Sequence, residues 1–214
     1  MSLDLHRLHV RPLAERRSLT RVEDILIDPA SPPPPASEVV SECAARIAAA
    51  RDRDAAVILM YGAHLIRNGA GLLVTEMMER GWITHLATNG AGSIHDWEYA
   101  WLGRSTESVE ENVATGTFGA WDETGRNLHL ALLAGGIAGE GYGASVGRFI
   151  HEDGVTLPSP EDIKHALAIP DDARAPAQAD LLAAMRTHAL AAGRHEVVHG
   201  WKHEIGRASC RERV

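Results

Sequence analysis

The chain has 214 residues, of which 45% are hydrophobic, so a globular protein with a sizeable core is expected and a disordered one is excluded. The formal net charge of −8 argues against a nucleic-acid-binding surface. No apolar stretch is long enough to span a membrane, and the N-terminus lacks the apolar run of a signal peptide. The two cysteines, Cys43 and Cys210, argue against a disulfide framework and fit a reducing, cytoplasmic location.

The two ends of the chain differ from its middle. Residues 1–36 are expected to be an N-terminal extension, which closes with the stiff proline-rich connector PASPPPPA at 29–36. Residues 204–214, EIGRASCRERV, resemble the in-frame translation of a sequencing adapter and are excluded from the fold prediction. The main domain is therefore placed at 37–203. The native protein is expected to continue past His203, which leaves this domain incomplete at its C-terminus.

The main domain begins with a pattern of helix, strand and helix. A helix is predicted over 37–53, because Ser37 is a suitable N-cap and the apolar residues that follow recur at helical spacing. The continuous apolar run 55–61, AAVILMY, is typical of a parallel strand that is buried on both faces. A second helix is predicted over 65–80, ending at Gly81.

The next stretch, 83–103, repeats the order of strand, turn and helix. A short buried strand is predicted at 83–87, followed by the small-residue turn 89–92 and a helix with Ser93 as its N-cap. A helix N-terminus after such a turn binds anions and nucleotide phosphates, because free N–H groups and the helix dipole point at the ligand. The two units together predict an α/β fold, a Rossmann-like doubly wound parallel sheet flanked by helices.

The remainder of the chain is predicted to be mostly helical. A capping pattern begins at Ser105 or Thr106 and extends to 115. Glycine-rich and proline-rich loops separate the later helices. These helices are expected at 124–138, 144–151, 160–168 and 179–192.

Several long motifs carry a resemblance to a known family. They are MYGAHLIRNG at 60–69, TNGAGSIHDWE at 88–98, GRSTESV at 103–109 and GTFG at 116–119. Together they resemble the deoxyhypusine synthase superfamily, in particular its bacterial deoxyhypusine synthase-like branch. The resemblance covers most of residues 16–150.

This resemblance implies a Rossmann-like fold, NAD as the cofactor and a homotetramer with active sites between subunits. Synthases of this type dehydrogenate spermidine with NAD and pass its aminobutyl group through an imine on a catalytic lysine. The family's NAD contacts fall here on two sets of residues, each of which follows a predicted strand. The first set is Ala63, His64 and Arg67, and the second is Thr88, Asn89, Gly90 and Ala91.

The chain departs from the family at the substrate site. Ile94 and His95 stand where synthases have an acidic pair that binds the polyamine cation. A neutral imidazole is a poorer cation partner than a carboxylate and a better general base. His95 and Asp96 are therefore the predicted catalytic residues. The expected reaction is NAD-dependent dehydrogenation of a small amine or polyamine, with spermidine itself disfavoured and aminobutyl transfer left open. Neither Lys164 nor Lys202 fits an imine-forming lysine, which requires a desolvated pocket.

Other interpretations stay open at this point. The chain could be a non-catalytic, nucleotide-binding oligomeric protein of the same fold, or carry NAD-dependent cyclodeaminase-type chemistry. His64 and His95 could be capped, hydrogen-bonded histidines without a chemical role. A metal site is not predicted: His195, His199 and His203 could share a helix face, but Gly200 interrupts that segment.

Overall fold

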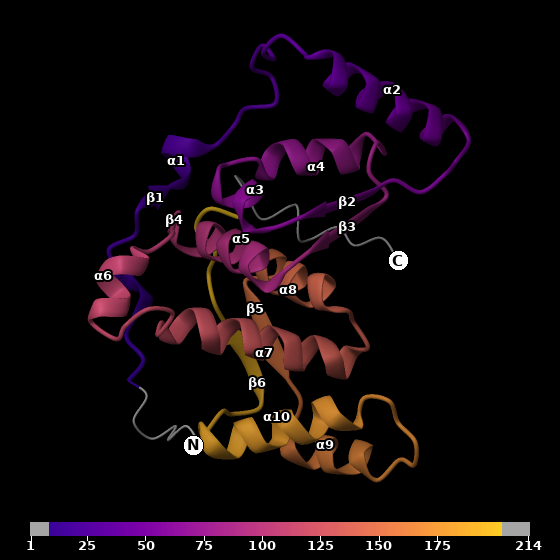
Figure 1. The fold of residues 1–214 in the computed structure, drawn as a ribbon. Coiled ribbons are helices and arrows are strands. Elements are labelled where there is room, and N and C mark those ends of the chain that lie inside the picture. Colours follow the sequence, from indigo (N-terminus) through magenta and orange to yellow (C-terminus); the bar gives the residue numbers. More distant parts are fainter. Residues whose placement is uncertain (1–8, 203–214) are drawn as a thin grey trace.

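The computed structural model describes residues 9–202, which form a helix-rich α/β structure with three small two-stranded sheets (Figure 1). The helices are η2 (Leu13–Glu15, 3-10), α1 (Val22–Ile25), α2 (Glu38–Asp52), α3 (Ala63–Arg67), α4 (Gly71–Glu79), α5 (Gly90–Leu102), α6 (Val109–Ala114), α7 (Asp122–Ala138), α8 (Tyr142–His151), α9 (Pro160–Leu167) and α10 (Ala175–Thr187). The strands are β1 (Thr20–Arg21), β2 (Ile58–Tyr61), β3 (His85–Thr88), β4 (Arg104–Ser105), β5 (Gly154–Leu157) and β6 (Gly193–Glu196). None of the helices in these residues is long and apolar enough to cross a bilayer.

The predicted order of strand, turn and helix, twice over, is confirmed in the middle of the chain. Strands β2 and β3 pair in parallel, with Tyr61 opposite Thr88, so both strands end at the same edge of the sheet. Helices α3 and α4 make the crossover between them, and α5 follows β3 (Figure 1). The carboxyl edge of this pair is where ligands bind in open α/β sheets.

The sheet around this pair is smaller than predicted. The other two sheets in residues 9–202, β1–β4 and β5–β6, are antiparallel. Ile58 and Met60 are 57% and 78% exposed, so the prediction that this strand is buried on both faces is wrong. Strand side chains alternate between faces, and in the described residues nothing covers the face to which these two belong.

The helix predicted over 65–80 is two helices. The break lies at Gly69, whose φ of +88° lies in the left-handed region that favours glycine. A Cβ atom at this position would lie 1.9 Å from the carbonyl oxygen of Ile25. The N-terminal segment therefore passes so close to Gly69 that a continuous helix with a side chain at this position would not fit.

The start of α5 also differs from the prediction. Asn89 is its N-cap and accepts a hydrogen bond from the Gly92 N–H at 3.1 Å, so Ser93 is inside the helix. The Ser93 hydroxyl donates instead to the Gly90 carbonyl at 2.9 Å. Similarly, α6 is capped by Ser108 and not by Ser105 or Thr106. In both helices the N-cap is the short polar residue that stands directly before the first helical residue.

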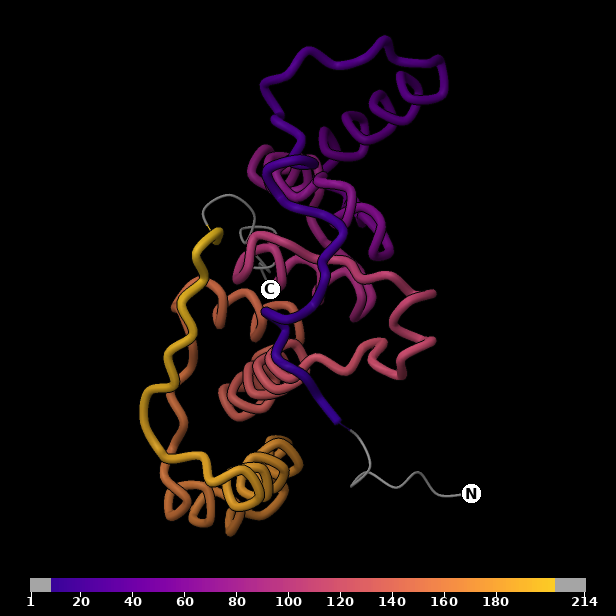
Figure 2. The backbone as a smooth tube through the Cα atoms, turned by 90° about the vertical axis from the view of Figure 1, so that its left-hand side faces the viewer, coloured from indigo at the N-terminus to yellow at the C-terminus, as the bar shows by residue number. Residues whose placement is uncertain are grey.

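The first helix of the main domain, α2, forms as predicted but stays apart from the core. Ser37 caps it by accepting from the Val40 N–H. None of its residues is buried, although Val39 and Val40 belong to its apolar face. Figures 1 and 2 show this helix at one extremity of the molecule, beyond α4.

The main core lies between α5, α7, α8, α9, α10 and the β5–β6 pair, and Leu13 of η2 also belongs to it. Three predicted helices appear there as α7, α8 and α9. The bounds of the helix predicted over 179–192 are wrong, because α10 begins at Ala175 and ends at Thr187. Strand β6 follows and pairs with β5. Trp97 is fully buried and stacks on Trp101 with ring centroids 5.1 Å apart, so this pair belongs to the core.

Candidate functional site

The turns that follow β2 and β3 lie next to each other at the carboxyl edge of the parallel pair. A Cβ atom placed on Gly62 would lie 3.8 Å from Asn89 Nδ2. Thr88, Asn89, Gly90 and Ala91 are all exposed, so a ligand can reach this predicted set. Gly92 permits the tight turn, because a Cβ there would lie 2.4 Å from Thr88 Oγ1.

Beside this edge lies a cavity of about 380 Å³ between α3, α5 and the segment that leads from β4 to α7. It is lined by Arg16, Ala63, His64, Arg67, Ile94, His95, Glu98, Thr106, Glu107, Val109, Phe118, Gly119, Trp121 and Thr124. The first predicted cofactor set and His95 therefore share one cavity. The second set lies at the neighbouring turn, outside this lining.

His95 is held in one tautomer by its neighbours. Its Nδ1 lies 2.7 Å from Ser105 Oγ, and that hydroxyl donates its only proton to Glu98 Oε2. Ser105 can therefore only accept from His95, so Nδ1 carries the proton. The other ring nitrogen, Nε2, is left with its lone pair on a ring that lines the cavity.

Burial lowers the pKa of the His95 imidazole, and the positive charges of Arg67 and Arg16 act in the same direction. Glu98 opposes these effects and raises the pKa. The net shift is downward, so the ring is neutral at pH 7. A neutral ring with a fixed, unprotonated nitrogen is suited to accept a proton.

Glu98 is anchored below His95 by a buried ion pair. Its two carboxylate oxygens accept from Arg16 Nη1 and Nη2 at 2.8 and 2.7 Å. Arg16 is 4% exposed and Glu98 is 1% exposed. Thr124 donates to the same carboxylate at 2.9 Å. This bidentate pair fixes the N-terminal segment to α5 and thereby the floor of the cavity.

Arg67 brings a positive charge to the other side of the cavity. Within residues 9–202 no carboxylate lies within ion-pair distance of its guanidinium, and its Nε is buried without a hydrogen-bond partner. The backbone carbonyl of the same residue accepts from the Tyr99 hydroxyl at 3.1 Å, which fixes the end of α3. An anionic group would satisfy this side chain.

Glu107 brings a negative charge that the sequence analysis did not single out. Its carboxylate accepts from three uncharged donors, Asn112 Nδ2, the Gly119 N–H and Trp121 Nε1, at 2.5, 3.1 and 3.0 Å. Its charge is therefore held in place without being neutralised. Sequence reasoning missed this residue because its donors lie in α6, in the loop after α6 and at the start of α7, and no local pattern predicts that they meet.

The other predicted site residues lie elsewhere. Asp96 is in α5, 2% exposed, and does not line the cavity. Burial raises the pKa of Tyr61, and the charge of Asp96 raises it further. The shared helix face of the histidines is wrong: His195 is in β6 and His199 lies beyond it, while His203 is outside the described residues. In residues 9–202 no group of three or more His, Cys, Asp or Glu side chains could hold a metal ion.

No protein-family model, curated protein or solved structure matches this chain.

Proposed function

We propose that the chain is an NAD-dependent enzyme that oxidises a small amine, of the deoxyhypusine synthase type that its sequence resembles. The observation that carries this proposal is the meeting of Arg67 and His95 in one cavity at the carboxyl edge of a parallel strand pair. Dinucleotides bind at such edges in α/β proteins.

The residues present fit a dinucleotide in two respects. Arg67 has a guanidinium without a carboxylate partner in residues 9–202 and a buried Nε without an acceptor, which suits a phosphate oxygen. The exposed turn 88–91 forms the N-terminus of the 13-residue helix α5, whose N–H groups and dipole favour an anion. Ala63, His64, Arg67 and this turn would hold NAD, which supplies a hydride acceptor when it is bound.

The catalytic role falls on His95. Oxidation of a deprotonated amine to an imine removes one hydride and one proton. The lone pair of His95 Nε2 takes that proton, while Ser105 and Glu98 keep the ring oriented. The carboxylate of Glu107 accepts hydrogen bonds from uncharged donors, which leave its negative charge in place. This charge suits binding of the second, cationic group of a diamine.

Transfer of an aminobutyl group through a lysine imine is not part of this proposal. Lys164 lies on α9 with its side chain 53% exposed, near Glu161. Lys202 donates to Asp153. Neither of them lines the cavity. The described residues therefore support oxidation and supply no nucleophile for the transfer.

The first test is a calorimetric titration with NAD. The wild-type chain should bind, and Arg67→Met should weaken binding by about 10-fold or more, as expected for a lost charged hydrogen bond. The matched control is Arg53→Met, an exposed arginine outside the cavity, which should leave the affinity unchanged. Absence of NAD binding by the wild type would overturn the proposal.

The second test measures NADH formation with butane-1,4-diamine and spermidine. His95→Asn keeps a donor near Ser105 but has no base, so the rate should fall by about 10²- to 10⁴-fold with NAD affinity retained. His85→Asn, an exposed histidine in β3 outside the cavity, is the control. NAD binding without amine-dependent NADH would favour the non-catalytic nucleotide-binding alternative.

We also propose the homotetramer that the resemblance implies. The uncovered face of β2, with Ile58 and Met60, supports it, because an apolar strand face is seldom left to water. Light scattering on the protein as it elutes from a size-exclusion column should give the mass of four chains. A monomer would contradict this part of the proposal and leave the NAD test unaffected.

A further inference from the structure

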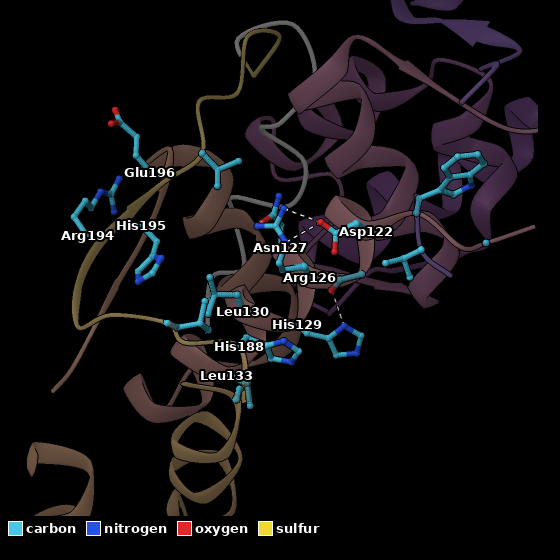
Figure 3. A pocket seen from close by; sticks show the side chains of 17 residues that line it. Asp122, Arg126, Asn127, His129, Leu130, Leu133, His188, Arg194, His195 and Glu196 are labelled. Carbon is cyan, nitrogen blue, oxygen red and sulfur yellow. Dashed lines mark hydrogen bonds and ion pairs between the residues drawn. The ribbon is translucent and has the colours of Figure 1, made fainter. Parts of the chain in front are cut away.

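A second, larger cavity lies between α7, the end of α10 and strand β6 (Figure 3). Its volume is about 730 Å³, within the range of sites that hold small organic ligands. Leu130, Leu133 and Leu190 are among its apolar lining residues. The rings of His129, His188 and His195 lie around Leu130 and Leu133 (Figure 3). None of these residues takes part in the reaction proposed above.

Hydrogen bonds to backbone carbonyl oxygens fix the tautomer of two of the three imidazoles. His129 Nδ1 lies 2.6 Å from the Gly125 carbonyl oxygen, and His195 Nε2 lies 2.7 Å from that of Ala191. A carbonyl oxygen can only accept, so these two nitrogens carry the protons. His129 Nε2 and His195 Nδ1 are then hydrogen-bond acceptors, and neither has a partner within residues 9–202. The cavity therefore offers a ligand two acceptors above an apolar floor.

The charges of the lining cancel. Arg126 donates to the carboxylate of Asp122 at 3.0 Å, a contact drawn in Figure 3. Arg194 donates to the carbonyl oxygens of Glu152 and Asp153, and its charge is balanced by that of Glu196 in the same lining. The two arginines and two carboxylates of the lining therefore sum to no net charge with which to attract an anion or a cation.

We propose that this cavity binds an uncharged aromatic molecule that carries a hydrogen-bond donor, such as a phenol or an N–H heterocycle. The donor bonds to the free nitrogen of His129 or His195. The ring packs on the leucines and on Trp121, which forms part of the wall. This inference does not depend on NAD binding or amine oxidation.

The test compares three probes of one shape by calorimetry and saturation-transfer NMR. Para-cresol has a donor, para-methylanisole has the same ring without a donor, and para-toluate has a charge. Para-cresol should bind about 2- to 13-fold tighter than para-methylanisole, the gain expected from one neutral hydrogen bond. Para-toluate should bind weakest. Tighter binding of para-toluate, equal binding of the first two probes, or binding of none would overturn the proposal.

Variants locate the binding in this cavity. Ala184→Leu fills it from α10 and should abolish para-cresol binding, whereas Ala183→Leu, an exposed neighbour outside the lining, should not. The pair His129→Phe and His195→Phe keeps two rings and removes both acceptors, so para-cresol should bind no better than para-methylanisole. His151→Phe, an exposed histidine outside the lining, is the matched control. Unchanged binding in Ala184→Leu would place the probe elsewhere and refute the assignment.

Discussion

Replacing Arg16 with methionine should destabilise the protein strongly, because it leaves the Glu98 carboxylate buried without its cation. The two side chains are 3% and 1% exposed and are joined by bonds of 2.8 and 2.7 Å. Loss of one partner of such a pair costs about 3–5 kcal/mol. Ser105 and Thr124 still donate to Glu98, so we expect the lower end, about 3 kcal/mol. In a domain of this length that corresponds to a fall in Tm of roughly 6–12 °C.

The assay is urea unfolding followed by tryptophan fluorescence. The control is Arg17→Met, since Arg17 pairs with Glu111 on the surface, with side chains 79% and 57% exposed. That change should cost less than about 1 kcal/mol. The double variant Arg16→Met/Glu98→Gln removes the buried charge and should be much more stable than the sum of the single variants predicts. Additive costs, or an Arg16→Met cost as small as that of Arg17→Met, would refute the reasoning.

Three further changes test other parts of the fold. Gly69→Ala should destabilise the protein by about 1–3 kcal/mol in urea unfolding, because its φ is +88° and the new Cβ would meet the Ile25 carbonyl; an unchanged midpoint would contradict this. Leu181→Ala, at a fully buried position, should cost about 2–5 kcal/mol in the same assay, and a smaller cost would show a looser core. Burial lowers the pKa of His199 to about 4, against 6.5 for an unhindered imidazole. The unfolded chain then takes up its proton first as pH falls from 6.5 towards 4, so stability should drop by up to about 3 kcal/mol over that window. His199→Phe should remove much of this drop, and an unaltered pH profile would exclude the histidine as its source.

Local patterns were enough to predict the parallel strand pair and the helices that follow it. The apolar run before Tyr61 and the small residues after Thr88 determine a strand and a turn within a few positions of each other. Because parallel strands end at one edge, His64 and His95, which follow the two strands in sequence, lie close together, and both line one cavity. This part of the site needed no knowledge of distant contacts.

Long-range pairings account for what the sequence did not reveal. Arg16 and Glu98 are 82 residues apart, and nothing in either neighbourhood indicates that they meet. Strand β6 begins directly after the segment 179–192 that was predicted to be helical, and no strand was predicted there. Its strand conformation comes from antiparallel pairing with β5, which only the folded chain provides.

The position of Trp121 constrains how substitutions can reshape the two cavities. Its indole lines both the smaller cavity near His95 and the larger one near His129. On one side it donates to Glu107 and lies 5.7 Å from the Arg16 guanidinium carbon. A substitution that reshapes one cavity through this residue therefore also reshapes the other. Because Trp121 lines both cavities, a change at this position alters the ligand selectivity of both. The two selectivities can diverge only through lining residues that the cavities do not share.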